Sequence, residues 1–151
     1  TPGIRFLEKM AVQIGGGVNH RFGLYDMMMI KDNHIDYAGS IEGAITRCHE
    51  YRINNGLDIK LEVEARDLEE VDRILAVGLV DRIMLDNFSL EDMRFAVNKY
   101  QGKVKFEASG NMTDAHIKDV ASTGVDFISV GALTKHVQAI DLSLRVVKED
   151  I

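Results

Sequence analysis

The sequence contains no tryptophan, one proline and one cysteine, and no hydrophobic run approaches the roughly 18 residues that a membrane-spanning helix needs. The single cysteine, Cys48, excludes a framework of intrachain disulfides, so we expect the reducing setting of the cytoplasm. Lysine and arginine are scattered and the net charge is −6, which argues against electrostatic binding to nucleic acid. Neither a membrane nor a nucleic acid is therefore an expected partner.

Helix and strand patterns alternate along the chain without a linker between them. The 151 residues, 46% of them hydrophobic, suit a single α/β domain over residues 1–151 with a real core. Short apolar runs predict strands at residues 27–30, 59–64, 82–85, 103–108 and 127–130. Because helical patterns separate these strands at a spacing of a little over about twenty residues, we expect right-handed βαβ units and a parallel sheet.

Capping residues mark the helices between the predicted strands. Ser40, Asp67, Ser89 and Thr113 stand where N-caps are expected, and Asp67 has a glutamate three residues later, as in a capping box. Apolar residues at helical spacing predict a last helix at residues 137–147.

Polar and apolar side chains alternate along two of the predicted strands. Lys60, Glu62 and Glu64 share one face of their strand, and Lys105 and Glu107 share one face of theirs. A doubly wound sheet should be apolar on both faces, so a parallel α/β barrel with a polar, ligand-bearing lumen fits better. An antiparallel sheet with one solvated face would also alternate and is the alternative. If Glu62 pairs with Lys60 and Glu107 with Lys105, these residues are structural and not catalytic.

Each predicted strand is followed by residues that can bind a ligand. In parallel sheets and barrels, ligand sites form at the carboxyl ends of the strands. The five strand ends carry, in order, Lys31, Glu64, Asp86 with Asn87, Ser109 with Gly110, and Gly131. Strand ends that are merely solvated would show a mixture of residue types, so this repetition indicates a site. His34, near the first strand end, could contact a ligand or could bond to the backbone of the turn.

Five ordered motifs give the sequence a resemblance to a known family. GGGVNHRFGLYD at residues 15–26 leads into IKDNH, and LEVEA, IMLDN, FEASG and DFISVGALT follow. Together they resemble the type II phosphoribosyltransferases, most closely the quinolinate phosphoribosyltransferase family, over nearly the whole chain. The resemblance implies an incomplete, TIM-like parallel α/β barrel behind a smaller α+β domain. A complete barrel takes roughly 250 residues, so 151 are few, and the resemblance implies a barrel fragment that lacks the first strand and the N-terminal domain.

The same resemblance assigns roles to residues of the first three strand ends. Lys31 matches the lysine that contacts both the substrate and the phosphoribosyl donor. Glu64 and Asp86 match the acidic pair near the donor's ribose and its Mg²⁺, an ion that prefers carboxylate oxygens and substrate phosphates. His20 and Arg21 match residues that hold the carboxylates of quinolinate, for which a planar guanidinium is well shaped. The expected catalytic residues are therefore the lysine and the acidic pair.

Two further segments match the family's cradle for the 5′-phosphate. Ser109, Gly110 and Asn111 form one loop, and Gly131 and Ala132 belong to the other; backbone N–H groups would hold the phosphate there. The sequence departs from the family at position 18, where valine stands for a frequent histidine, and at position 111, where asparagine stands for a frequent glycine. Asparagine tolerates a positive φ better than most residues, so the first loop remains a candidate.

The resemblance implies transfer of a phosphoribosyl group from phosphoribosyl pyrophosphate to quinolinate, with loss of pyrophosphate and CO₂. The product would be nicotinate mononucleotide, a step of NAD biosynthesis. The resemblance also implies a homodimer whose sites borrow residues from the neighbouring N-terminal domain. Three alternatives stay open: a sister enzyme that uses nicotinate, a Schiff-base lyase that uses Lys31, and a non-catalytic fragment that only binds a phosphorylated ligand or a partner chain.

Overall fold

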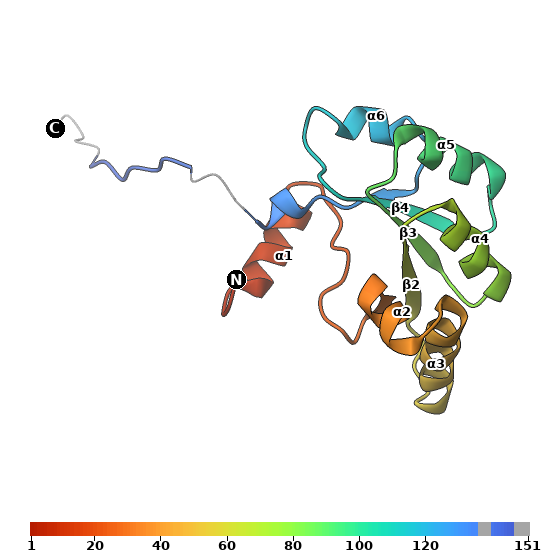
Figure 1. Ribbon diagram of the computed structural model, residues 1–151. Coiled ribbons are helices and arrows are strands. Elements are labelled where there is room, and N and C mark those ends of the chain that lie inside the picture. The colour runs from red at the N-terminus through yellow and green to blue at the C-terminus, as the bar shows by residue number, and fades with distance from the viewer. Residues whose placement is uncertain (136–139, 147–151) are drawn as a thin grey trace.

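Five parallel strands form the centre of the computed structural model, which describes residues 1–135 and 140–146 (Figure 1). They are β1 (Met27–Ile30), β2 (Lys60–Ala65), β3 (Arg82–Asp86), β4 (Lys105–Ser109) and β5 (Phe127–Ile128). Each strand pairs with the next one along the chain, in the order β1-β2-β3-β4-β5. This consecutive order is that of a barrel segment and not of a doubly wound sheet, so the predicted fold class is confirmed.

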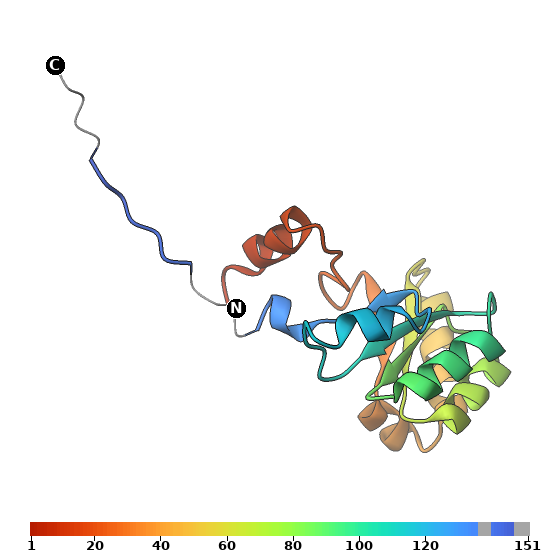
Figure 2. The same cartoon turned by 90° about the horizontal axis from the view of Figure 1, so that it is seen from above.

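One helix precedes the first strand, and the other helices connect the strands. They are α1 (Arg5–Ile14), α2 (Asp32–Ala38), α3 (Ile41–Asn54), α4 (Leu68–Val77), α5 (Leu90–Lys99) and α6 (Ile117–Ala121), and a 3₁₀ turn, η1 (Gly131–Leu133), follows β5. Figure 2 shows α1, in red, standing apart from the helices that cover the sheet. No helix in the described part of the chain is both long and apolar enough to cross a membrane.

Three of the four predicted N-caps are confirmed. Ser40, Asp67 and Ser89 each accept a hydrogen bond on the side chain from the backbone N–H three residues later. The prediction that Thr113 is an N-cap is wrong, because α6 begins only four residues after it. The Thr113 hydroxyl instead lies 3.3 Å from His116 Nδ1, within the turn that leads into α6.

The structure differs from the predicted elements in three other places. The short helix α2 follows β1 directly, where the sequence indicated only a polar strand end; seven residues are too few to show a helical period. β4 begins two residues later and β5 ends two residues earlier than predicted. Residues 140–146 are not helical, and 137–139 and 147 lie outside the described residues. Leu142 and Leu144 are exposed, so no packing stabilises a helix there.

The two faces of the sheet differ as the alternation predicted. One face is apolar and packs against helices. The fully buried side chains of this layer include Leu61, Val63, Ile83 and Leu85 on the strands and Ile45, Val71 and Ile74 on the helices. Burying each such side chain stabilises the fold by about 1.5–3 kcal/mol. The other face, called the inner face below, carries Glu62, Glu64, Arg82 and Glu107. The helices therefore hold the strands in place from one side and leave the polar side for contacts with other groups.

An aspartate precedes β3 and another precedes β5, and both make the same contact. Asp126 Oδ2 accepts a hydrogen bond from the Phe106 N–H at 2.9 Å, and its Oδ1 lies 2.6 Å from Lys105 Nζ. Asp81 Oδ2 accepts a hydrogen bond from the Leu61 N–H at 2.8 Å. Each aspartate therefore ties the start of its own strand to the start of the preceding strand.

Replacing Asp126 with asparagine is expected to lower the free energy of unfolding by about 1 kcal/mol at pH 7. Partial burial raises the pKa of Asp126, but the Lys105 ammonium and the Phe106 N–H together lower it more, so its pKa lies below its usual value. Such a carboxylate stabilises the fold above its unfolded-state pKa of about 3.9, and this contribution is lost as the pH falls through the folded-state pKa.

Urea unfolding of the natural protein at neutral and at acidic pH measures this effect. The exposed Asp58 supplies the control, and Asp58→Asn should change the unfolding free energy little at either pH. A deficit of Asp126→Asn that grows on acidification, instead of shrinking, would contradict the assignment.

Candidate functional site

Lys31 and Glu64 meet at the carboxyl ends of β1 and β2. The strands pair with Ile30 opposite Val63, so the next residue of each strand lies at the same edge. Lys31 Nζ is 3.2 Å from Glu64 Oε2, and the two side chains are 47% and 10% exposed respectively. An exposed ammonium beside an almost buried carboxylate is suited to binding an anionic ligand, because the carboxylate holds the lysine at the carboxyl edge of the sheet.

The side chain of His34 bonds to the backbone at Lys31. Its Nδ1 accepts a hydrogen bond from the Lys31 N–H at 3.0 Å, at the point where α2 begins. Of the two interpretations that the sequence left open, the contact with the backbone of the turn is therefore the one the structure supports. The first turn of α2 is then fixed relative to the lysine that ends β1.

Asp86, at the end of β3, lies beside the first predicted phosphate loop. It is in register with Ser109, the last residue of β4. The loop continues through Gly110, with a φ of +98°, and Asn111, with a φ of +46°. A Cβ atom on Gly110 would lie 2.1 Å from Asn87 Oδ1, so only glycine fits at this position. A cavity of about 500 Å³ opens beside the loop, bordered by Gly110, Asn111 and Asn87.

Glu64 and Asp86 are the two residues predicted to bind Mg²⁺. Glu64 is in register with Met84, so Asp86 stands two residues further along the neighbouring strand, with the two Cα atoms about 8 Å apart. Mg²⁺ typically keeps several waters and is bound by one or two carboxylates together with substrate phosphates. Two carboxylates on neighbouring strands at this spacing fit an ion that completes its coordination with water and phosphate oxygens.

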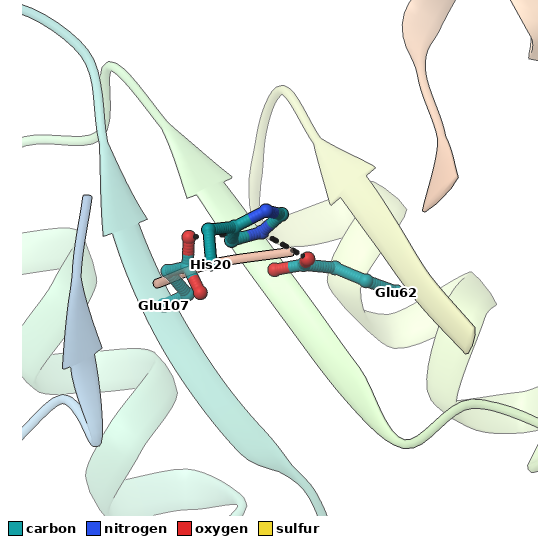
Figure 3. Close-up of side chains that lie close together, drawn as sticks. All are labelled: His20, Glu62 and Glu107. Carbon is teal, nitrogen blue, oxygen red and sulfur yellow. Dashed lines mark hydrogen bonds and ion pairs between the residues drawn. The ribbon is translucent and has the colours of Figure 1, made fainter. Parts of the chain in front are cut away.

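His20 reaches the inner face of the sheet from the loop between α1 and β1. Its Nε2 lies 2.7 Å from Glu62 Oε2 and 3.4 Å from Glu107 Oε1, and both glutamates are buried (Figure 3). Glu107 also accepts hydrogen bonds from Arg82 and from the Ser129 hydroxyl.

The predicted pairing of the two glutamates with Lys60 and Lys105 is therefore wrong. Both lysines stand at the first positions of their strands and are exposed, and Lys105 pairs with Asp126 instead. The carboxylates lie deeper in the sheet, where only buried or half-buried donors reach them. The structural role of the glutamates stays a prediction, and the partners that the structure gives them come from a distant loop and from the neighbouring strands.

The same His20, Glu62 and Glu107 form a group that could hold a metal ion. His20 Nε2 and one oxygen of each glutamate lie within 4.8 Å of one another, and Zn²⁺ accepts this combination of ligands. Arg82 and Ser129 already bond to Glu107, however, and the guanidinium compensates the charge of that carboxylate. We therefore assign the cluster to anchoring residues 15–26 on the inner face.

Arg21, Gly131 and Ala132 lie apart from the residues at the first three strand ends. Arg21 donates to the Met27 carbonyl at 3.3 Å, at the start of β1, so its guanidinium points toward the opposite end of that strand from Lys31. Gly131 and Ala132 lie in η1, past the end of β5, and are exposed. Within the described residues, no hydrogen bond or ion pair joins these three to Lys31, Glu64 or Asp86. The predicted site is therefore assembled only in part.

Known proteins resemble this chain in sequence and in structure. The sequence model of the family described as "Quinolinate phosphoribosyl transferase, C-terminal domain" matches residues 1–145. A protein of Arabidopsis thaliana, named nicotinate-nucleotide pyrophosphorylase (carboxylating), chloroplastic, is 44% identical over 160 aligned residues, which cover 97% of this chain and 46% of that protein. A protein of Synechocystis, named probable nicotinate-nucleotide pyrophosphorylase (carboxylating), is 44% identical over 151 residues, which cover 98% and 50%.

A solved structure shares the fold. The nicotinate-nucleotide pyrophosphorylase from Francisella tularensis superposes with a TM-score of 0.87 at 48% identity, over 95% of this chain and 49% of that one. The chain thus spans about half the length of the curated relatives it matches. With the family match extending over residues 1–145, and with Lys31, Glu64 and Asp86 at successive strand ends, the chain belongs to the quinolinate phosphoribosyltransferase family.

Proposed function

We propose that this protein transfers the phosphoribosyl group of phosphoribosyl pyrophosphate to quinolinate and releases pyrophosphate, CO₂ and nicotinate mononucleotide. The observation that carries the proposal is the contact of Lys31 with Glu64, beside Asp86 in register with Ser109, at the carboxyl ends of four consecutive strands. Ligand sites of barrels form at this end of the strands. In a chain of this family, those residues are the natural place for the two substrates.

The reaction has two steps that the site must support. First, the ring nitrogen bonds to the anomeric carbon while the bond from that carbon to pyrophosphate breaks, so positive charge develops on the ribose. Then the carboxylate next to the ring nitrogen leaves as CO₂, the positively charged nitrogen stabilises the electron pair left behind, and a proton takes its place. Preorganised charges near these centres stabilise the transition state more than charges in water do, because they need not reorganise during the reaction.

The residues at the strand ends suit these requirements. The Lys31 ammonium would pair with the anionic groups of the substrates, and the carboxylates of Glu64 and Asp86 would face the developing positive charge of the ribose. The same two carboxylates would hold Mg²⁺, which neutralises the departing pyrophosphate when bound. The 5′-phosphate would lie against the backbone N–H groups of residues 109–111 and of Gly131 and Ala132.

His20 and Arg21 would bind the two carboxylates of quinolinate. Both already have partners, because His20 bonds to Glu62 and Arg21 bonds to the Met27 carbonyl. Binding of the dicarboxylate would therefore have to exchange these contacts for contacts with the substrate. A charge-assisted pair between Arg21 and a carboxylate is stronger than its bond to a neutral carbonyl, which favours the exchange.

We also propose a homodimer located in the cytoplasm. The dimer would supply cationic groups that the four strand ends lack, and a closed twofold assembly is the most frequent oligomer of soluble proteins. The single cysteine, Cys48, supports the proposed location, because one cysteine cannot form an intrachain disulfide; the name of the Arabidopsis relative places that protein in the chloroplast.

A product assay on the natural full-length protein tests the function. The protein is incubated with phosphoribosyl pyrophosphate, Mg²⁺ and either quinolinate or nicotinate, and CO₂ and mononucleotide are followed. Product with quinolinate alone is the expected result. Product with nicotinate alone would show instead that the protein has the activity of the sister enzyme. No product with either substrate would refute phosphoribosyl transfer; borohydride trapping of a carbonyl substrate on Lys31 would then identify the lyase alternative.

A further inference from the structure

Asn87, directly after β3, has a backbone conformation that few residues adopt. Its φ is +55°, in the left-handed region, and among the described non-glycine residues only Asn111 shares a positive φ. Asparagine tolerates this region better than other residues with a Cβ, but the conformation persists only where surrounding contacts hold it. The two unusual asparagines are neighbours in space, since the Asn111 amide donates to Asn87 Oδ1 at 3.2 Å.

The Asn87 residue bonds to three residues of the proposed site. Its Nδ2 donates to Asp86 Oδ2 at 2.9 Å, and its backbone N–H donates to the Ser109 carbonyl at 3.0 Å. Its Oδ1 accepts from Asn111, and lies over Gly110 so closely that a Cβ there would be 2.1 Å away. One side chain therefore joins the carboxylate at the end of β3 to the loop at the end of β4.

The chemistry of the partners fixes the direction of these hydrogen bonds. An ionised Asp86 can only accept, so the Asn87 NH₂ group must face it. The carbonyl oxygen of Asn87 must then face Asn111, which presents its own NH₂ group. Within the described residues Asp86 Oδ1 has no hydrogen bond, so one carboxylate oxygen is held and the other stays available to a ligand. Only an amide supplies the donor and the acceptor in these two places.

We propose that Asn87 is a positioning residue for phosphoribosyl transfer, which orients the Asp86 carboxylate and holds the phosphate loop of residues 109–111. The inference rests on the proposed function, because Asp86 and the loop have their roles only in that reaction. Asn87 acts through these neighbours and not by contact with the reacting atoms. Residues that orient a ligand-binding group in this way typically change affinity or activity about 10- to 100-fold when they are replaced.

Two substitutions in the natural full-length protein separate the amide from the backbone conformation. Asn87→Gly keeps the positive φ and removes both side-chain bonds. Asn87→Asp keeps the shape but places a carboxylate oxygen against Asp86, where a donor is needed. Asn98→Ala, on the exposed face of α5, is the matched control. We expect both Asn87 variants to unfold near the wild-type temperature and to lose about 10- to 100-fold in kcat/KM for phosphoribosyl pyrophosphate, while the control keeps wild-type kinetics.

Calorimetric titration with phosphoribosyl pyrophosphate and Mg²⁺ gives a second readout that does not depend on turnover. Both Asn87 variants should bind the donor at least about tenfold more weakly than the wild type does. Wild-type kinetics or wild-type donor affinity in both variants would overturn the inference. If Asn87→Gly shows both a lower unfolding temperature and a lower activity, Asn87→Asp decides between positioning and stability. A normal unfolding temperature with normal kinetics in Asn87→Asp would leave Asn87 a purely structural role.

Gly110→Ala tests the contact between Asn87 and the loop directly. Alone, this change forces a Cβ against Asn87 Oδ1 and should weaken donor binding sharply. In the Asn87→Gly background that clash is gone, so Gly110→Ala should cost less than it does in the wild type. Additive losses in the two backgrounds would contradict the coupling.

Failure of the function and failure of this inference give different results. A wild type that binds the donor but forms no mononucleotide refutes the proposed reaction and with it the role of Asn87 in that reaction, and the donor affinities then decide only whether Asn87 supports donor binding. A wild type that neither turns over nor binds the donor overturns both proposals. A wild type that is active beside equally active Asn87 variants overturns only the positioning role.

Discussion

If the proposed phosphoribosyl transfer is correct, alanine at position 31 is expected to reduce its kcat/KM by about 10²- to 10³-fold, because the cation proposed to face the anionic reactants is lost. Lys31 is half exposed and its ion pair with Glu64 lies at the edge of the sheet. Because the ammonium is half exposed but Glu64 is only 10% exposed, the loss of stability should lie between that of a surface pair and that of a fully buried pair, and so below the loss expected for Arg82→Ala. Steady-state kinetics of the full-length protein, together with thermal unfolding, measure both effects.

Two further variants make the result specific to Lys31. Lys118→Ala removes an exposed lysine from α6, on the helical side of the sheet, and should leave kcat/KM unchanged. Lys31→Arg keeps the positive charge but replaces a compact ammonium with a planar fork, so it should restore only part of the activity. Equal losses in Lys31→Ala and Lys118→Ala would mean that net charge matters and the strand-end position does not.

Arg82→Ala is expected to lower the free energy of unfolding by about 3–5 kcal/mol, because it leaves the buried Glu107 without its cationic partner. The Arg82 guanidinium bonds to Glu107, which is 1% exposed, and lies 4.0 Å from the centre of the Phe127 ring. Removing one member of a buried pair costs far more than the pair itself contributes, since the remaining charge is not solvated. Urea unfolding at pH 7 measures the loss.

Arg73 provides the control for Arg82. It makes an ion pair with Glu42 at 2.9 Å, but the two side chains are 42% and 49% exposed, so Arg73→Ala should cost no more than about 1 kcal/mol. Glu107→Gln in the Arg82→Ala background removes the unsolvated charge and should recover part of the stability. Similar losses for Arg73→Ala and Arg82→Ala, or no recovery in the double variant, would refute the role assigned to burial.

Local sequence rules predicted much of the fold correctly. Ser40, Asp67 and Ser89 cap their helices as expected, because a cap depends on residues only three positions apart. The alternation in β2 and β4 placed Glu62 and Glu107 on one face for a similar reason, since neighbouring side chains of a strand must point to opposite sides. Where local information was thin, in the seven residues of α2, the prediction failed.

The sequence by itself determined the five strands, the polar residues at their carboxyl ends, and the family to which the chain belongs. Only the tertiary structure decided which side chains meet: His20 with Glu62 across 42 residues, and Asn111 with Asn87 across 24. Such contacts depend on strand register and on the path of a loop, and many arrangements of the same local elements satisfy the same periodicity. Packing of the whole sheet selects one of them, which is why the partners could not be predicted from the residues alone.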